Sequence, residues 1–133
     1  TKTIIETLNN YLKKKKKKGI ILPVSAPFHC SLMQKASENM KNKIENTDFL
    51  KPNPSIISNV TAKEENDTNS IKSLLVKQIT SRVRWRESVE YMIKEGVKDF
   101  IEIGPGKVLS GLVKKTNKDV KISNFNSVED ATK

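Results

Sequence analysis

The order of apolar segments near the end of the chain is the feature that most restricts its fold. "KDFIEIG" (98–104) is typical of a short buried strand, and "GPG" of a tight turn. "KVLSGLVKK" (107–115) then has the apolar spacing of a helix, and "VKISNF" (120–125) is typical of a second strand. Strands that alternate with helices are characteristic of α/β proteins with a largely parallel sheet. We therefore expect an α/β fold.

The rest of the 133-residue chain continues this alternation. Helical spacing of apolar residues predicts helices over 3–14, from 31 onward, over 70–79 and over 84–96. We expect Gly19 to stop the first helix, Ser70 to cap the third and Gly96 to end the fourth. Strands are expected over 20–24 and 55–60, and residues 61–70 are expected to form polar turns. The chain opens with a lone helix and strand, which indicates a sequence that begins partway through a domain.

Charge and composition exclude several classes of protein. No apolar run approaches the length of a membrane span, and a single cysteine excludes an internal disulfide framework and a thiolate zinc cluster. The net charge is +10, and the unbroken run Lys13–Lys18 supplies six of those charges. This run is interpreted as a solvated insertion, as an electrostatic docking segment or as a nucleic-acid contact. The interleaved aromatic residues of nucleic-acid modules are missing, which disfavours the third interpretation.

The stretch "LPVSAPFHC" (22–30) contains the only histidine, His29, directly before the only cysteine, Cys30. His29 falls between a predicted strand and a predicted helix, where open α/β sheets place active groups. An imidazole there can act as a general base, but it can equally pack against the start of the helix. A metal site is poorly supported, because one His and one Cys do not supply enough converging ligands. Cys30 is interpreted as a small apolar residue.

Two further features lie downstream. Gly104 and Gly106 flank Pro105 before a helix, yet Lys107 is followed by Val108 and not by the Ser or Thr of a phosphate-binding loop. We interpret this stretch as a strand–turn–helix connection. Gln78 stands at the end of an otherwise apolar helical face, where a free carbonyl or a polar side chain can hold an imidazole in one tautomer. A solvent-facing glutamine is the alternative.

These stretches occur in a familiar order. "LPVSAPFHCSLM", "SNVT", "LLVKQITSRVRW" and "SVEYMIKEGVKDFIEIGPGKVLSGLVKK" together resemble the C-terminal part of the malonyl-CoA:acyl carrier protein transacylases. Acyltransferase domains of fatty-acid and polyketide synthases belong to the same family. The resemblance extends from about residue 20 to residue 128 and rests on several spaced motifs.

The resemblance implies roles for three residues. His29 matches the catalytic histidine of the family, which deprotonates a serine nucleophile and then the incoming thiol. Gln78 matches the glutamine whose main-chain carbonyl orients that histidine. Phe28 resembles the malonyl-selecting residue. No metal or cofactor is implied, because malonyl-CoA and phosphopantetheinyl acyl carrier protein are substrates.

The resemblance also implies an organisation. It predicts an α/β fold that is the C-terminal half of an α/β-hydrolase-like acyltransferase domain. Residues 1–24 would be the end of a ferredoxin-like small subdomain, and residues 25–133 part of the large subdomain. The G-H-S-x-G serine elbow and the arginine that binds the malonyl carboxylate do not occur in the chain, so we expect a fragment that is inactive by itself.

Partners and location follow from the same resemblance. We expect acyl carrier protein as the partner, no nucleic acid, no membrane, and a monomer at full length. Carrier proteins are acidic, so basic side chains can steer docking; the candidates are Lys77, Arg82, Arg84, Lys107 and Lys114. The expected location is bacterial cytoplasm or the matrix of a plastid-like organelle. A multidomain synthase and a non-enzymatic basic binding module are the alternatives.

Overall fold

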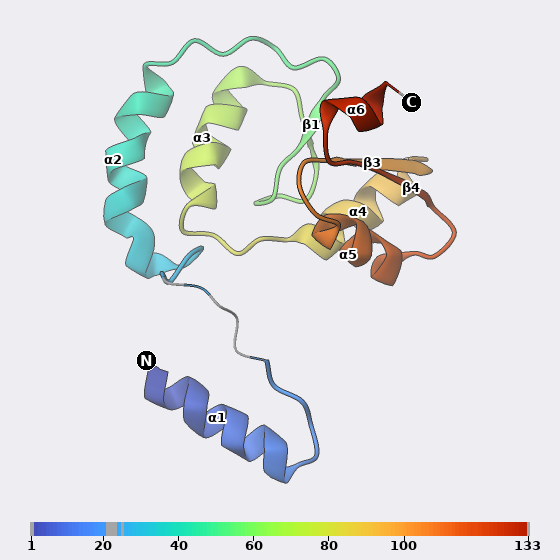
Figure 1. Cartoon of the computed structure of the whole chain (residues 1–133). Coiled ribbons are helices and arrows are strands. Elements are labelled where there is room, and N and C mark those ends of the chain that lie inside the picture. The colour runs from blue at the N-terminus through green and yellow to red at the C-terminus, as the bar shows by residue number, and fades with distance from the viewer. Residues whose placement is uncertain (1, 21–23, 25, 133) are drawn as a thin grey trace.

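The computed structural model describes residues 2–20, 24 and 26–132. Its helices are α1 (Lys2–Lys14), the 3-10 turn η1 (Ser31–Met33), α2 (Gln34–Glu45), α3 (Thr68–Gln78), α4 (Trp85–Lys94), α5 (Val108–Thr116) and α6 (Val128–Ala131). Its strands are β1 (Ile56–Ile57), β2 (Glu64–Glu65), β3 (Asp99–Ile103) and β4 (Lys121–Phe125). In Figure 1, α2 and α3 lie side by side, α4 and α5 lie against the β3–β4 pair, and α1 lies apart from the other elements.

The β3–turn–α5–β4 unit forms as its sequence predicts. The two strands are parallel, in a register that pairs Asp99 with Lys121 and Ile103 with Phe125. Helix α5 crosses between them and contacts both strands. Phe100 of β3 lines a pocket together with Trp85 of α4 and Val113 of α5. Helices α4 and α5 therefore cover the face of the strand pair on which Phe100 lies. This arrangement places the turn after β3 at the carboxyl ends of two parallel strands.

The core is small and lies mainly beneath the helices. Val89 of α4 is fully buried, and Val113 of α5 and Ile71 of α3 are nearly so. The hydroxyl of Ser37 in α2 donates to the carbonyl of Val76 in α3 at 3.1 Å, which ties these two helices together near the end of α3. Burial and this hydrogen bond therefore fix the position of the end of α3, where Gln78 stands.

Several predicted boundaries are wrong in detail. Helix α1 ends at Lys14 as predicted, but Gly19, five residues later, does not stop it. The side chain of Asp67, and not Ser70, caps α3, because its carboxylate accepts from the Ser70 N–H at 2.7 Å. The predicted turn segment contains β2, which pairs antiparallel with β1. The strand predicted over 20–24 falls largely outside the described residues.

The prediction of a buried β3 is also wrong. Burial alternates along the strand, and Ile101 and Ile103 are 61% and 83% exposed. Their side chains share the face of β3 opposite to Phe100, since residues two apart point the same way in a strand. Helices α4 and α5 cover only the Phe100 face, so the isoleucine face is open in this chain.

Candidate active site

His29 stands in a tight turn immediately before η1. The Phe28 N–H donates to the Ala26 carbonyl at 2.9 Å, and the Cys30 thiol donates to the Pro27 carbonyl at 3.1 Å. His29 itself has φ of 58°, which lies in the left-handed region that few non-glycine residues adopt. Such a conformation costs backbone free energy and is held only where the surrounding bonds define it. The turn therefore fixes the direction in which the His29 side chain leaves the backbone.

The end of α3 supplies a carbonyl for that side chain. The last carbonyls of a helix lack an intrahelical partner and need another donor. The Val76 carbonyl accepts from Ser37 and from the Ile79 N–H, and the Lys77 carbonyl accepts from the Thr80 and Ser81 N–H groups. The Gln78 carbonyl is bonded to Nδ1 of His29 at 2.9 Å. His29 and Gln78, which are 49 residues apart, thus meet because the last carbonyl of α3 needs a hydrogen-bond donor from outside the helix.

This contact determines the protonation of the imidazole. A carbonyl oxygen only accepts hydrogen bonds, so Nδ1 of His29 carries the hydrogen. In the neutral ring the lone pair then lies on Nε2, and Nε2 is the atom free to take a proton. His29 is exposed, so an external hydroxyl or thiol can reach this nitrogen. The geometry is that of a general base whose tautomer is set by a neutral acceptor.

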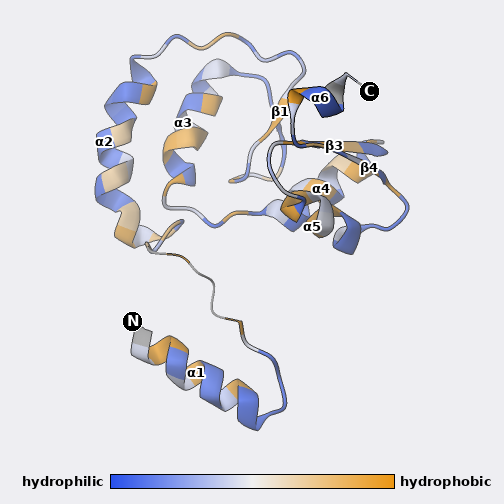
Figure 2. Cartoon of the chain, in the orientation of Figure 1, coloured by the Kyte–Doolittle hydropathy of each residue, from blue (hydrophilic) through white to orange (hydrophobic). Residues whose placement is uncertain are grey.

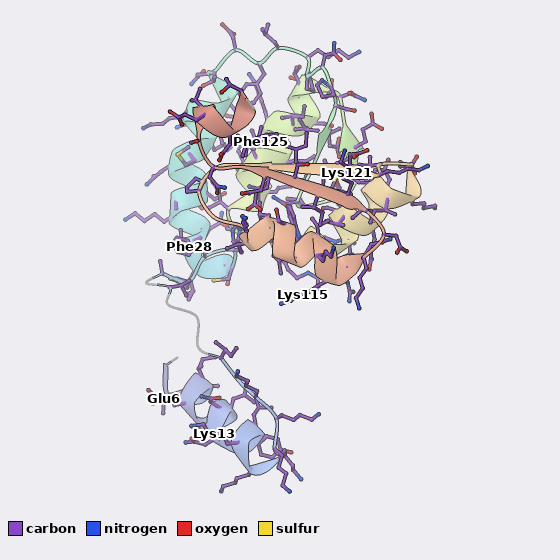
Figure 3. All side chains as sticks on the ribbon, turned by 45° about the vertical axis from the view of Figure 1, so that its right-hand side comes forward. Glu6, Lys13, Phe28, Lys115, Lys121 and Phe125 are labelled. Carbon is purple, nitrogen blue, oxygen red and sulfur yellow. The ribbon has the colours of Figure 1, made fainter. Side chains whose placement is uncertain are left out.

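The other two predicted site residues are Phe28, next to His29 in the sequence, and Gln78, whose carbonyl meets it. Phe28 is 56% exposed and projects near the start of α2 (Figure 3), where a substrate can reach its ring. Gln78 also lines a pocket with Ile56 and Leu74, in addition to the contact of its carbonyl with His29. Among the described residues no group of three His, Cys, Asp or Glu side chains is placed to hold a metal ion. The catalytic and selective roles of His29, Gln78 and Phe28 stay predictions.

The turn after β3 is held by side chains that sequence reasoning missed. Glu102 of β3 accepts hydrogen bonds from the N–H groups of Leu109 and Ser110 and from the Ser110 hydroxyl. Asn126 accepts from the Gly106 N–H at 2.9 Å, and Asn124 donates to the Gly106 carbonyl at 2.9 Å. The first amides of α5 are therefore occupied by a carboxylate of the protein, which supports the structural interpretation of this turn. The sequence signal for this role was the position of Glu102, two residues before Gly104 and shortly before the predicted helix.

Glu102 gives this turn a pH dependence. Hydrogen bonds from the Ser110 hydroxyl first, and then from the Ser110 and Leu109 amides, lower the pKa of the Glu102 carboxyl below its ordinary value of 4.5. A lowered pKa in the folded state stabilises the fold above the unfolded pKa. That contribution is lost as the pH falls below 4.5 and through the lowered value.

We expect Glu102→Gln to lower the midpoint of urea unfolding at pH 7, because a neutral amide is a weaker acceptor for three donors. The difference between variant and unmodified protein should shrink as the pH falls below 4.5 and then through the lowered pKa of Glu102, because the folded carboxyl becomes neutral only below that lowered pKa. Urea titrations at pH 7, 5 and 3.5 measure it. A difference that does not change with pH would contradict this role of Glu102.

Two of the predicted docking residues are already paired. Arg82 Nη2 lies 3.0 Å and Arg84 Nε 3.5 Å from the same carboxylate oxygen of Glu87. Arg84 also donates to the Thr61 carbonyl. The Glu87 pKa is lowered, chiefly by the hydrogen bond to its own backbone N–H and then by the two arginines, although desolvation opposes the shift. Their positive charge is therefore partly neutralised within the chain.

Comparison with known proteins shows which proteins this chain resembles. The chain is 45% identical over 114 residues to the malonyl CoA-acyl carrier protein transacylase of Staphylococcus aureus, and 48% identical over 105 residues to that of Bacillus subtilis. These matches cover 86% and 79% of the chain. The chain is thus related to the C-terminal part of the malonyl CoA-acyl carrier protein transacylases. No protein-family model matches the chain.

Solved structures agree with this assignment. The acyl-carrier-protein-S-malonyltransferase of Bartonella henselae superposes with a TM-score of 0.87 at 43% identity, over 96% of this chain. A malonyl-transacylase in complex with a type II polyketide synthase acyl carrier protein superposes with a TM-score of 0.87 at 32% identity. The predicted fold class, α/β and the C-terminal half of such an enzyme, is confirmed.

The similarity covers a minor part of each relative. The chain spans 37% of the Staphylococcus protein, 33% of the Bacillus protein and 41% of the Bartonella structure. A division of the chain near residue 24 stays a prediction.

Proposed function

We propose that the intact enzyme containing this chain transfers a malonyl group from malonyl-CoA to the phosphopantetheine thiol of acyl carrier protein, in type II fatty-acid synthesis. The observation that carries the proposal is the 2.9 Å contact between His29 Nδ1 and the Gln78 carbonyl, in a chain 45% identical to part of a named transacylase. The chain supplies the base of this site, and the remaining part of the enzyme supplies the serine nucleophile.

The reaction has two half-reactions that use the same nitrogen. In the first, Nε2 of His29 takes the serine proton while the serine oxygen attacks the malonyl thioester. The C–S bond breaks, and the CoA sulfur leaves as a thiol with that proton. In the second, Nε2 takes the proton of the phosphopantetheine thiol, whose sulfur attacks the malonyl-serine ester. The serine leaves with the proton, so the imidazole ends as it began.

The proposal also covers the choice of acyl group, the partners, the oligomeric state and the location of the enzyme. The ring of Phe28, beside the base, limits the room for a branched acyl group. The reaction needs no metal or cofactor, and the proposed partners are malonyl-CoA and acyl carrier protein. A monomer is proposed for the intact enzyme. The relatives named above are bacterial, which supports a cytoplasmic location; a plastid-like organelle is the alternative.

A second candidate is the same transfer within polyketide synthesis. It is favoured by the similar structure of a malonyl-transacylase bound to a polyketide synthase carrier protein. The two candidates share the chemistry and differ in the carrier. A comparison of kcat/KM for fatty-acid and polyketide carrier proteins separates them.

The experiment follows radiolabelled malonyl from malonyl-CoA to phosphopantetheinyl acyl carrier protein, with the intact enzyme and with its Gln78→Ala variant. We expect transfer by both, with kcat within about fivefold, because any residue provides the same main-chain carbonyl and an ordinary hydrogen bond contributes only about 1 kcal/mol. Cys30→Ser serves as a neighbouring control.

Two results would count against the proposal. An intact enzyme that transfers no malonyl group would exclude the function. A Gln78→Ala variant that folds normally but loses orders of magnitude in kcat would assign the action to the glutamine side chain, against the geometry described here.

A further inference from the structure

The polybasic segment, Lys13–Lys18, is a concentrated charge that the reaction does not use. All six side chains are exposed, and together they supply six of the net ten positive charges. They occupy the last turn of α1 and the loop that follows it, and Lys13 is visible there in Figure 3. Lysines at the C-terminal end of a helix interact favourably with its dipole, which offsets part of their mutual repulsion.

Backbone contacts give this segment a defined shape. The Lys15 N–H donates to the Tyr11 carbonyl at 3.1 Å, and the Lys17 N–H donates to the Leu12 carbonyl at 2.9 Å. Lys16 has φ of 55°, which reverses the chain after the helix. Gly19 then lies so close to α1 that an added Cβ would be 2.4 Å from Asn9 Oδ1. The lysines are therefore displayed on a folded reversal of the chain, which lowers the entropy lost when a partner binds.

The charge of the polybasic segment is not neutralised by ion pairs in the described part of the chain. The ion pairs found there join Lys41 to Glu45, Arg82 and Arg84 to Glu87, Arg86 to Glu90, and Lys121 to Asp99. Glu6 is the only acidic residue of α1. The surface of α1 alternates between apolar and strongly polar positions and ends in this charge (Figure 2). The positive potential of the polybasic segment is thus available to an external anion.

We propose that the polybasic segment is an electrostatic docking surface for the acidic acyl carrier protein, an inference that rests on the proposed function. Several like charges on one surface steer an oppositely charged protein and raise its association rate. Electrostatic steering of the carrier protein acts over about one Debye length, about 8 Å at physiological salt, so the lysines do not need to contact His29. No aromatic residue lies among the six lysines. The neighbouring Tyr11 ring lies 5.9 Å from Lys15 Nζ, so a single aromatic ring adjoins the segment, without the successive aromatic residues on which bases stack.

The test compares two sixfold Lys→Gln variants of the intact enzyme. One replaces the polybasic segment. The matched control removes the same net charge from exposed, dispersed positions: Lys35, Lys43, Lys51, Lys63, Lys94 and Lys98. The readouts are kcat/KM for the carrier protein at 20 mM and 500 mM salt, transfer to free pantetheine, which carries no net charge, and direct binding of the carrier by calorimetry.

We expect the clustered variant to lose about tenfold in kcat/KM for the carrier at low salt, with little loss at high salt and none toward pantetheine. The dispersed variant should lose less than twofold, and a sixfold Lys→Arg variant should keep the full rate. If the clustered Lys→Gln protein does not fold, Lys17→Gln with Lys18→Gln, beyond the end of α1, should give a smaller loss with the same salt dependence.

Other outcomes would overturn this inference. Equal losses in the clustered and dispersed variants would assign the effect to overall charge. An unchanged carrier rate together with weakened binding of a random RNA oligonucleotide would assign the segment to nucleic acid. If the unmodified enzyme transfers malonyl to neither acceptor, the proposed function fails. Calorimetry then still decides whether the segment binds the carrier.

Discussion

The intact enzyme with His29→Ala should acylate its serine at least about a thousandfold more slowly than the unmodified enzyme. The change removes Nε2, the proposed proton acceptor, and leaves a methyl group that cannot accept a proton. The Gln78 carbonyl also loses its partner, but the hydrogen bond lies at the solvent-exposed end of α3, where water can replace the imidazole. The rate of malonyl labelling by radiolabelled malonyl-CoA, measured in a rapid-quench instrument, gives the effect directly.

Cys30→Ser is the matched control for that measurement. Its side chain stands next to His29, and a hydroxyl can donate to the Pro27 carbonyl as the thiol does. We expect its labelling rate to stay within about fivefold of the unmodified enzyme, since a neutral hydrogen bond contributes only about 1 kcal/mol. Circular dichroism of both variants checks the fold. Normal labelling of a folded His29→Ala protein would show that another group is the base.

The second large effect concerns the 133-residue chain by itself. We expect it to transfer no measurable malonyl group to carrier protein, because it contains the base without the G-H-S-x-G serine elbow. When nucleophile and base act as a unit, loss of either member alone costs up to about a millionfold in rate. Here the rest of the site is missing as well.

The comparison uses equal concentrations of the chain and of the intact enzyme in the same radiolabel assay. Addition of the chain to an intact His29→Ala enzyme is a useful control, and it should restore nothing if the site forms only within one folded enzyme. Turnover by the chain alone, at a rate near that of the intact enzyme, would contradict the prediction and would require a nucleophile among the residues of this sequence.

Local patterns predicted the parts of the fold that depend on near neighbours. The β3–turn–α5–β4 unit was recognised because Gly104, Pro105 and Gly106 separate an apolar strand from a periodic helix. Strand β2 was missed because Glu64–Glu65 has no strand-like composition and exists only through its register with Ile56–Ile57. Ser70 was mistaken for the cap of α3; the cap is Asp67, three residues earlier, whose carboxylate accepts from the Ser70 N–H.

The site was accessible to sequence reasoning only in part. The position of Gln78 at a helix end followed from apolar spacing, but its meeting with His29, 49 residues away, followed from family resemblance and not from any local pattern. Glu102 was missed because its partners Leu109 and Ser110 become neighbours only after the glycine turn has formed. The exposure of Ile101 and Ile103 depends on what covers the second face of β3, which no strand pattern specifies.

The bond from His29 to the end of α3 has a consequence for the charge inside the proposed site. A helix C-terminus presents roughly half a negative charge as aligned peptide dipoles, without any ionised acid. Such a dipole stabilises the transient imidazolium while adding no full anion to the cavity. Malonate brings its own carboxylate, and a buried aspartate behind the imidazole would repel it by Coulomb interaction. In the proposed reaction, a neutral peptide oxygen in that place allows both a proton on the imidazole and an anionic acyl group beside it.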